Sequence, residues 1–271
     1  MQQILCSTGA VIGRPNGRDF TLLRSCVERL ECDGYEFMMY EAWYGKEDAL
    51  CDFLTRLGVP FPVFHVEKSV GNLISRNQPG DVEKALDLFG ANCALAKALG
   101  ADRLVLHLWG GLDSDKDIAH NIGCYPMLQS ISCSHGLDLM VENVVCNRAD
   151  PMTHLLALAQ AYPKVQFTFD TKMAAFHGQM DLLYAEENRH LFPHIRHIHL
   201  NDYAGGYMDW GNLQTLHVGD GNVDFPKLFH FLKRMQYQGD YTVEATSFDG
   251  TGKIYYEDLN RTFRKIREYL A

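Results

Sequence analysis

The pattern of hydrophobic and polar positions changes period repeatedly along this chain. Short apolar runs rich in strand-forming residues alternate with longer segments in which apolar residues recur at helical spacing. The clearest expected helix covers residues 80–100, with Asp81 as its N-cap and Gly100 as its stop. A last helix is expected over residues 255–270. The expected strands cover residues 3–9, 35–40, 61–67, 102–109, 137–143, 165–171, 195–202 and 240–246.

Eight strands, each followed by a helical segment, over about 250 residues is the count of a (β/α)8 barrel. The alternative is an open doubly wound sheet, which usually carries a Gly-x-Gly-x-x-Gly turn after its first strand. The glycines of "STGAVIGRPNG", which begins at Ser7, lack that spacing. Because we find no linker, low-complexity segment or break in composition, we expect one α/β domain, a (β/α)8 TIM barrel over residues 1–271.

The segment "HIRHIHLND", residues 194–202, reads as one strand with two different faces. His197, His199 and Asn201 point to one face of this strand, whereas Ile198 points to the other. An apolar face suits packing against helices, so we expect the histidine face to look into the barrel. His197 lies one layer deeper than His199, and we expect it to be a core histidine or a support for a ligand.

Ionisable residues stand at the ends of six consecutive strands, which a barrel places on the face that carries its active site. They are His65, His107, Glu142, Asp170, His199 and Glu244. Taken singly, such a histidine is more often hydrogen-bonded than a ligand, and such a carboxylate usually caps a helix or pairs with a lysine. Three carboxylates within apolar runs, however, repel one another at close range unless a cation compensates. A divalent metal ion held by Glu142, Asp170, His199 and Glu244 resolves the conflict, and the oxygen and nitrogen donors suit Mn²⁺, Co²⁺, Zn²⁺ or Mg²⁺.

Composition narrows the function classes. The 271 residues are 46% hydrophobic and 22% charged, an ordinary globular composition. No apolar run approaches the roughly 20 residues of a membrane span. The net charge of −9 gives no basic field for nucleic acid or anionic lipid. Eight cysteines without Cys-x-x-Cys spacing favour free thiols in a reducing compartment, so we expect a cytoplasmic protein.

The short sequence motifs around these residues resemble those of one known superfamily of (β/α)8-barrel proteins. They are "VEN" at Glu142, "FDT" at Asp170, "HIHLND" at His199, "HVGDGNVDF" from His217 and "TVEA" at Glu244. They are similar to the xylose-isomerase-like barrel superfamily, which includes sugar phosphate isomerases and epimerases of the tagatose-3-epimerase type, inosose-metabolising enzymes and the endonuclease IV nucleases. The resemblance implies a (β/α)8 barrel with one catalytic divalent metal ion on those four residues. It does not fix a substrate.

The sequence also departs from that group. Met173 stands where many members carry a histidine that contacts substrate or a further metal ion, and His177 is nearby. Leu213 and Thr215 stand where the nucleases carry an Asp-x-His pair, so two ligands of their third metal ion are missing together with the histidine at 173. His65 and His107 occupy positions that complete another zinc site in the nucleases, and the epimerases also use a histidine at the second of these positions.

A sugar substrate matches this site directly. A metal ion that chelates a carbonyl oxygen and the neighbouring hydroxyl stabilises the enediolate formed when the adjacent carbon loses its proton. The resemblance makes Glu142 and Glu244 the base and acid, while a water or Lys172 is the alternative proton carrier. We therefore expect an isomerase or epimerase of a small sugar, sugar phosphate or polyol-derived ketone. The expected substrate contacts are His65, His107, Trp109, Lys172, His177 and Asn201.

Other functions stay open at this stage. One is an abasic-site DNA nuclease like endonuclease IV, whose phosphate contacts would come from Lys68, Arg76, Arg148 and Lys172, although the net charge does not favour nucleic acid. Another is an inosose-type dehydratase on the same metal site. A catalytically silent barrel is the third, and the intact set of four argues against it. No membrane association is expected, and a homo-oligomer is compatible with the sequence.

Overall fold

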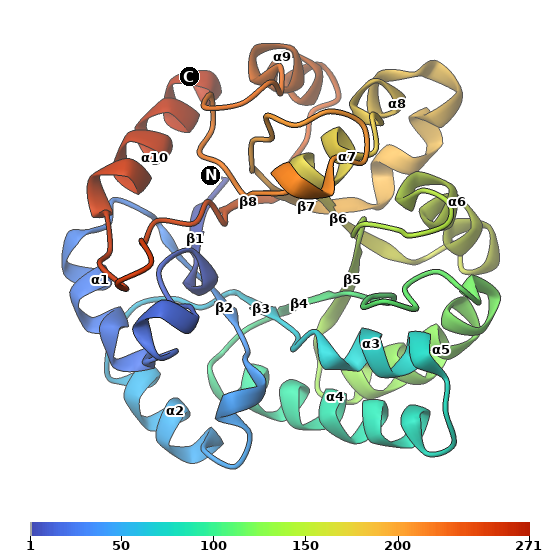
Figure 1. The fold of residues 1–271 in the computed structure, drawn as a ribbon, viewed down its shortest axis with the longest axis horizontal. Coiled ribbons are helices and arrows are strands. Elements are labelled where there is room, and N and C mark those ends of the chain that lie inside the picture. The colour runs from blue at the N-terminus through green and yellow to red at the C-terminus, as the bar shows by residue number, and fades with distance from the viewer. Residues whose placement is uncertain (1) are drawn as a thin grey trace.

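The structure, a computed structural model, describes residues 2–271, so only residue 1 of the predicted domain lies outside it. Eight parallel strands form a closed barrel in chain order, with β1 paired to both β2 and β8. The helices form a ring around the strands (Figure 1). The predicted (β/α)8 barrel is thus confirmed. The strands are β1 Ile4–Ser7, β2 Gly34–Met38, β3 Val63–His65, β4 Arg103–Leu106, β5 Asp138–Glu142, β6 Gln166–Asp170, β7 Ile195–His199 and β8 Asp240–Val243.

The ring of helices closes between the two ends of the chain. The last helix, α10, lies beside the segment after α1, where the Asn260 side chain accepts from the Glu31 backbone N–H and donates to the Arg29 carbonyl. The helices are α1 Leu23–Arg29, α2 Glu47–Thr55, α3 Ser69–Arg76, α4 Asp81–Ala98, α5 Ile118–Ser134, α6 Pro151–Ala161, α7 Thr171–Phe176, α8 Met180–Tyr184, α9 Phe225–Arg234 and α10 Tyr256–Leu270.

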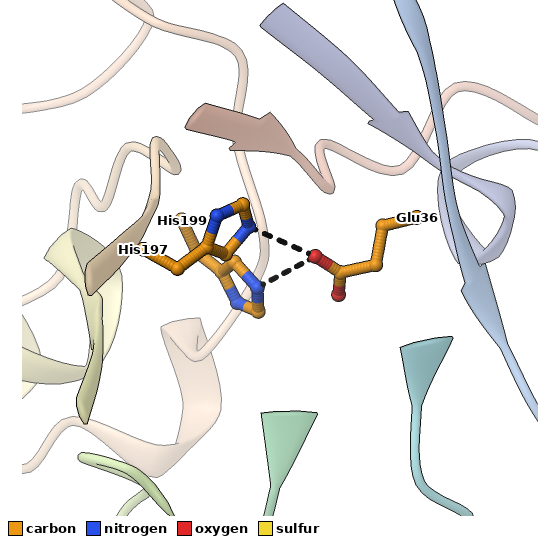
Figure 2. Close-up of side chains that lie close together, drawn as sticks. All are labelled: Glu36, His197 and His199. Atoms are coloured by element: carbon orange, nitrogen blue, oxygen red, sulfur yellow. Dashed lines mark hydrogen bonds and ion pairs between the residues drawn. The ribbon is translucent and has the colours of Figure 1, made fainter. Parts of the chain in front are cut away.

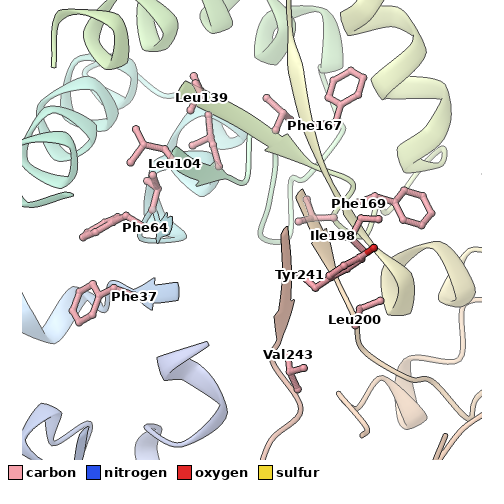
Figure 3. Close-up of a cluster of buried hydrophobic side chains, with 14 of the residues drawn as sticks. Phe37, Phe64, Leu104, Leu139, Phe167, Phe169, Ile198, Leu200, Tyr241 and Val243 are labelled. Carbon is pink, nitrogen blue, oxygen red and sulfur yellow. The ribbon is translucent and has the colours of Figure 1, made fainter. Parts of the chain in front are cut away.

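The alternation of each strand sorts its side chains between two environments. Outward-facing residues such as Phe37, Phe169 and Ile198 belong to the large apolar core between the strands and the helices (Figure 3). A second, separate apolar cluster comprises Leu5, Val63, Val105 and Met140, all fully buried. The last three stand two residues before His65, His107 and Glu142, so this cluster forms an apolar layer inside the barrel, directly beneath the polar strand ends.

The observed elements differ from the predicted ones mainly at their ends. The predicted strand 102–109 ends at Leu106, and the strand 195–202 ends at His199. The predicted N-cap at Asp81 is wrong, because Gly80, with a φ of 84°, precedes α4. The Asp81 carboxylate instead accepts from the Gln78 backbone and pairs with Arg76. Gly100, with a φ of 80°, ends the helix region as predicted.

Two further expectations concern the whole chain. All eight cysteines are free, as predicted. Within residues 2–271, no helix is both long enough and apolar enough to cross a membrane.

Candidate metal centre

The four predicted metal ligands converge at the C-terminal end of the barrel. Glu142, Asp170 and His199 end β5, β6 and β7, and Glu244 directly follows β8. The candidate ligand atoms of all four lie within 4.8 Å of one another. His199 Nδ1 lies 3.3 Å from both Glu142 Oε1 and Glu244 Oε2, and 3.9 Å from Asp170 Oδ2. Three carboxylates therefore surround one imidazole nitrogen.

Asn201 holds two of these carboxylates in place. Its side-chain amide donates to Asp170 Oδ2 at 2.8 Å and to Glu244 Oε2 at 3.0 Å. Its side-chain oxygen accepts from the Glu244 backbone N–H at 3.0 Å. Asn201 was expected to contact the substrate, but it is fully buried and all these bonds lead to the candidate ligands. Its position fits a residue that sets the separation of Asp170 and Glu244.

His65 and His107 face the outer side of Glu142. Their Nε2 atoms lie 3.4 Å and 2.7 Å from Glu142 Oε2. Even so, Glu142 Oε2 is buried and receives no hydrogen bond of ordinary geometry from any residue between 2 and 271. An oxygen that two imidazoles contact without a well-aligned hydrogen bond is incompletely satisfied. A cation beside Oε2 would complete its partners.

A fourth buried carboxylate, which the sequence reasoning missed, lies beneath the four residues. Glu36 sits in the middle of β2, fully buried, and its Oε2 atom is 3.1 Å from the Nε2 atoms of both His197 and His199. Figure 2 shows the two imidazole rings directed at this one oxygen. The signal was present, because an acidic residue flanked by apolar ones in "GYEFM" is the same signal that singled out Glu142.

The ionisation of these groups follows from their mutual charges. Burial opposes the charge on His199, but Glu244 and the other carboxylates outweigh it and hold its pKa well above the usual range. Burial likewise opposes the charge on Glu244, yet His199 lowers its pKa to about 2. Burial raises the pKa of Asp170 to about 6, because the opposing charge of Lys172 is outweighed. The cluster is thus strongly anionic and attracts positive charge to its centre.

The donor set fits a divalent cation. Three carboxylates and one imidazole supply oxygen and nitrogen donors, which suit Mn²⁺, Co²⁺, Mg²⁺ or Zn²⁺. His199 presents Nδ1 to the carboxylates while its Nε2 faces Glu36, so one nitrogen is directed at the site and the other is engaged below it. The residues present therefore match the metal ion that the sequence led us to expect.

The remaining predicted substrate contacts lie in different surroundings. Lys172, 8% exposed, donates from Nζ to Thr215 Oγ1 at 2.8 Å and lies close enough to act on the charge of Asp170. Trp109 is fully buried, and its indole N–H donates to the Val144 carbonyl at 3.1 Å. His177 Nε2 accepts from the Cys146 backbone N–H. The structure thus brings Lys172 to the edge of the site, whereas Trp109 Nε1 and His177 Nε2 hydrogen-bond to the backbone of the loop after β5.

A second group of ionisable side chains connects the loops after β4 and β5 with helix α6. Asp115, Cys146 and His154 are buried and close together. The Asp115 carboxylate accepts from the backbone N–H groups of residues 147–149 and pairs with His154 Nε2 at 3.0 Å. Both oxygens of the Asp115 carboxylate are therefore engaged by donors. The cluster joins two loops and is not a second metal centre.

Comparison with known proteins agrees with the fold. The family model described as xylose isomerase-like TIM barrel matches residues 26–266. The chain belongs to this family. No curated protein matches the sequence.

Solved structures with the same architecture include sugar epimerases. A D-tagatose 3-epimerase-like protein superposes with a TM-score of 0.74 at 18% identity, over 99% of this chain and 97% of the other. The D-allulose 3-epimerase from Methylomonas sp., solved in complex with D-allulose, gives 0.70 at 16% identity, over 99% and 97%. A xylose isomerase domain protein from Alicyclobacillus acidocaldarius subsp. acidocaldarius gives 0.70 at 18% identity, over 100% and 98%. At these identities the likeness shows the fold.

Proposed function

We propose that this protein is a divalent-metal-dependent isomerase or epimerase of a small sugar, sugar phosphate or polyol-derived ketone. The observation that carries the proposal is the convergence of Glu142, Asp170, His199 and Glu244 at the catalytic end of the barrel. Membership of the xylose isomerase-like family and the epimerases among the structural neighbours support it. An inosose-type dehydratase on the same residues is a variant of this proposal.

The residues can perform a proton transfer in both directions. A divalent cation held by the four ligands would supply a Lewis acid that stabilises negative charge on the substrate oxygens. Glu142 and Glu244 project from β5 and from the end of β8, so their carboxylates enter the site from different strands. One carboxylate removes the proton from the carbon beside the carbonyl, and the other returns a proton to the opposite face. The configuration of that carbon is thereby inverted.

Side-chain exposure indicates how a substrate reaches the site. The side chains of Glu142, Asp170 and His199 are at most 1% exposed, whereas those of Glu244 and His107 are 11% and 12% exposed. A substrate therefore meets Glu244 and His107 first. His107 is held in its neutral form by burial, which lowers its pKa to about 4. Its Nε2 faces Glu142 Oε2 at 2.7 Å and carries the proton, so Nδ1 can accept a hydrogen bond from a substrate hydroxyl without adding charge.

The nuclease alternative has one observation in its favour, which is the second potential metal group of His65, His107 and Glu142. The basic side chains that would contact DNA phosphates argue against a nuclease. Arg76 is held by Asp81 at 2.5 Å, and Lys172 is buried against Thr215. The net charge of −9 also disfavours the electrostatic part of DNA binding. We therefore retain the sugar isomerase or epimerase as the function.

The test is a panel of ketoses incubated with the protein in D2O, in the presence of Mn²⁺, Co²⁺ or Mg²⁺, and followed by NMR. The proposal expects deuterium at one carbon beside the carbonyl, together with an epimer or an aldose isomer. Loss of water from a polyol-derived ketone would identify the dehydratase variant instead. Cleavage of an abasic-site duplex, with no reaction on any ketone, would refute the proposal.

A further inference from the structure

We propose that Glu36 is a positioning residue that fixes the ring of His199, so that Nδ1 is the nitrogen offered to the metal ion. This inference rests on the proposed function, because it assumes that His199 is a ligand. It adds a residue from β2, a strand that contributes none of the four ligands and lies three strands from β7 around the closed barrel.

The geometry around Glu36 supports a dedicated role. Its Oε2 atom accepts from three donors: His199 Nε2 at 3.1 Å, His197 Nε2 at 3.1 Å and Thr242 Oγ1 at 2.8 Å. All four residues are fully buried. Three donors on one oxygen fix that oxygen in space. Figure 2 shows the two donors from β7, His197 and His199. Glu36 is in this way a rigid acceptor beneath His199.

This acceptor decides the tautomer of His199. Without a metal ion the raised pKa keeps His199 protonated on both nitrogens, but a histidine that binds a metal ion is neutral, with its proton on one nitrogen and a lone pair on the other. Because Nε2 faces a carboxylate oxygen, the proton belongs on Nε2. The lone pair is then on Nδ1, the atom that lies 3.3 Å from Glu142 Oε1 and Glu244 Oε2. A carboxylate behind a ligating histidine fixes the ring orientation and increases the basicity of the ligand atom.

A plain packing role does not account for this arrangement. A buried carboxylate costs far more than an apolar side chain of the same size, and its second oxygen, Oε1, finds no donor among residues 2–271. The apolar cluster of Leu5, Val63, Val105 and Met140 shows that the barrel interior accommodates apolar residues one layer away. The buried charge of Glu36 therefore needs a role other than packing. We assign that role to its contact with His199, the one candidate metal ligand that Glu36 hydrogen-bonds.

The test compares the affinity of Mn²⁺ for the wild type, Glu36→Gln and Glu36→Leu by isothermal titration calorimetry. The glutamine variant keeps the shape and removes the charge, whereas the leucine variant also removes the acceptor. We expect Mn²⁺ binding about 10-fold weaker for Glu36→Gln and up to about 100-fold weaker for Glu36→Leu, the usual range for residues behind metal ligands.

The matched control is Thr168→Val. Thr168 is fully buried, pairs with His197 in the sheet register, and its hydroxyl finds no partner within the described chain. This control removes a polar group from the same region without touching His199, and its Mn²⁺ affinity should equal that of the wild type. Equal Mn²⁺ affinity for the wild type and both folded Glu36 variants would overturn the positioning role and leave the proposed function standing. A wild type that binds no Mn²⁺, Co²⁺, Mg²⁺ or Zn²⁺ would overturn both.

A second measurement needs no variant and remains decisive where a Glu36 variant fails to fold. Long-range ¹H–¹⁵N NMR spectra of the Zn²⁺-loaded, ¹⁵N-histidine-labelled wild type report which nitrogen of His199 carries the proton. We expect a protonated Nε2, and a proton on Nδ1 would refute the proposal. In the calorimetric comparison, two metal ions per wild-type chain with one lost in Glu36→Gln would also refute it, because Glu36 would then be a ligand itself.

Discussion

Asn201 offers a quantitative test of how the candidate centre is held together. In Asn201→Ala, the hydrogen bonds to Asp170 Oδ2 and Glu244 Oε2 disappear, and two buried carboxylates each lose a donor. A hydrogen bond to a charged group contributes about 1.5–3 kcal/mol, so the two together predict a loss of about 3–6 kcal/mol in the free energy of unfolding. The measurement is urea denaturation of chelator-treated protein, followed by circular dichroism.

The matched control is Asn212→Ala, which also removes an amide-to-carboxylate hydrogen bond. Asn212 Nδ2 donates to Asp209 Oδ2 at 2.7 Å, but the pair is exposed to solvent. Water replaces the lost bond there, so the unfolding free energy should change by less than about 1 kcal/mol. If Asn201→Ala costs no more than Asn212→Ala, the burial argument for the centre is wrong.

Three further predictions concern the ligands and a loop. Glu142→Gln and Glu244→Gln should each abolish turnover in the ketose assay while the fold is retained, and near wild-type turnover in either would contradict the assignment of base and acid. His199→Ala should weaken Mn²⁺ binding measured by calorimetry, whereas unchanged affinity would remove His199 from the ligand set. Burial opposes the charge of Asp115, but His154 and three backbone N–H groups outweigh it and lower its pKa to about 2. A lowered pKa stabilises the fold above the ordinary value near 4, and that contribution disappears as pH falls towards 2. The difference in unfolding free energy between the wild type and Asp115→Asn should therefore shrink between pH 5 and pH 2, and a constant difference would refute the role of Asp115.

The sequence predicts the barrel well because period-2 and period-3.6 segments alternate without interruption. It also predicts the convergence of Glu142, Asp170, His199 and Glu244, because parallel strands in a closed barrel bring their C-terminal ends to one face. The fold follows from local periodicity. The convergence of the four residues follows from the closed parallel barrel, which leaves few alternative positions for the strand ends.

The sequence could not predict contacts that cross the barrel. Glu36 lies 161 and 163 residues from His197 and His199, and no local pattern pairs them. Trp109 was expected to contact the substrate because it stands at the end of the predicted strand 102–109, where aromatic side chains commonly stack on the apolar faces of sugars. The strand stops at Leu106, however, and the chain turns before Trp109, which packs instead against His154. Strand ends depend on tertiary packing, which local sequence does not encode.

The most direct test of the whole account is elemental analysis by inductively coupled plasma mass spectrometry. The protein should be purified without chelator or metal-affinity resin, beside a His199→Ala sample prepared identically. The account predicts about one Mn, Co, Mg or Zn ion per wild-type chain and much less in His199→Ala. Wild-type protein that contains no metal and takes up none on addition would show that these four residues do not form a metal centre.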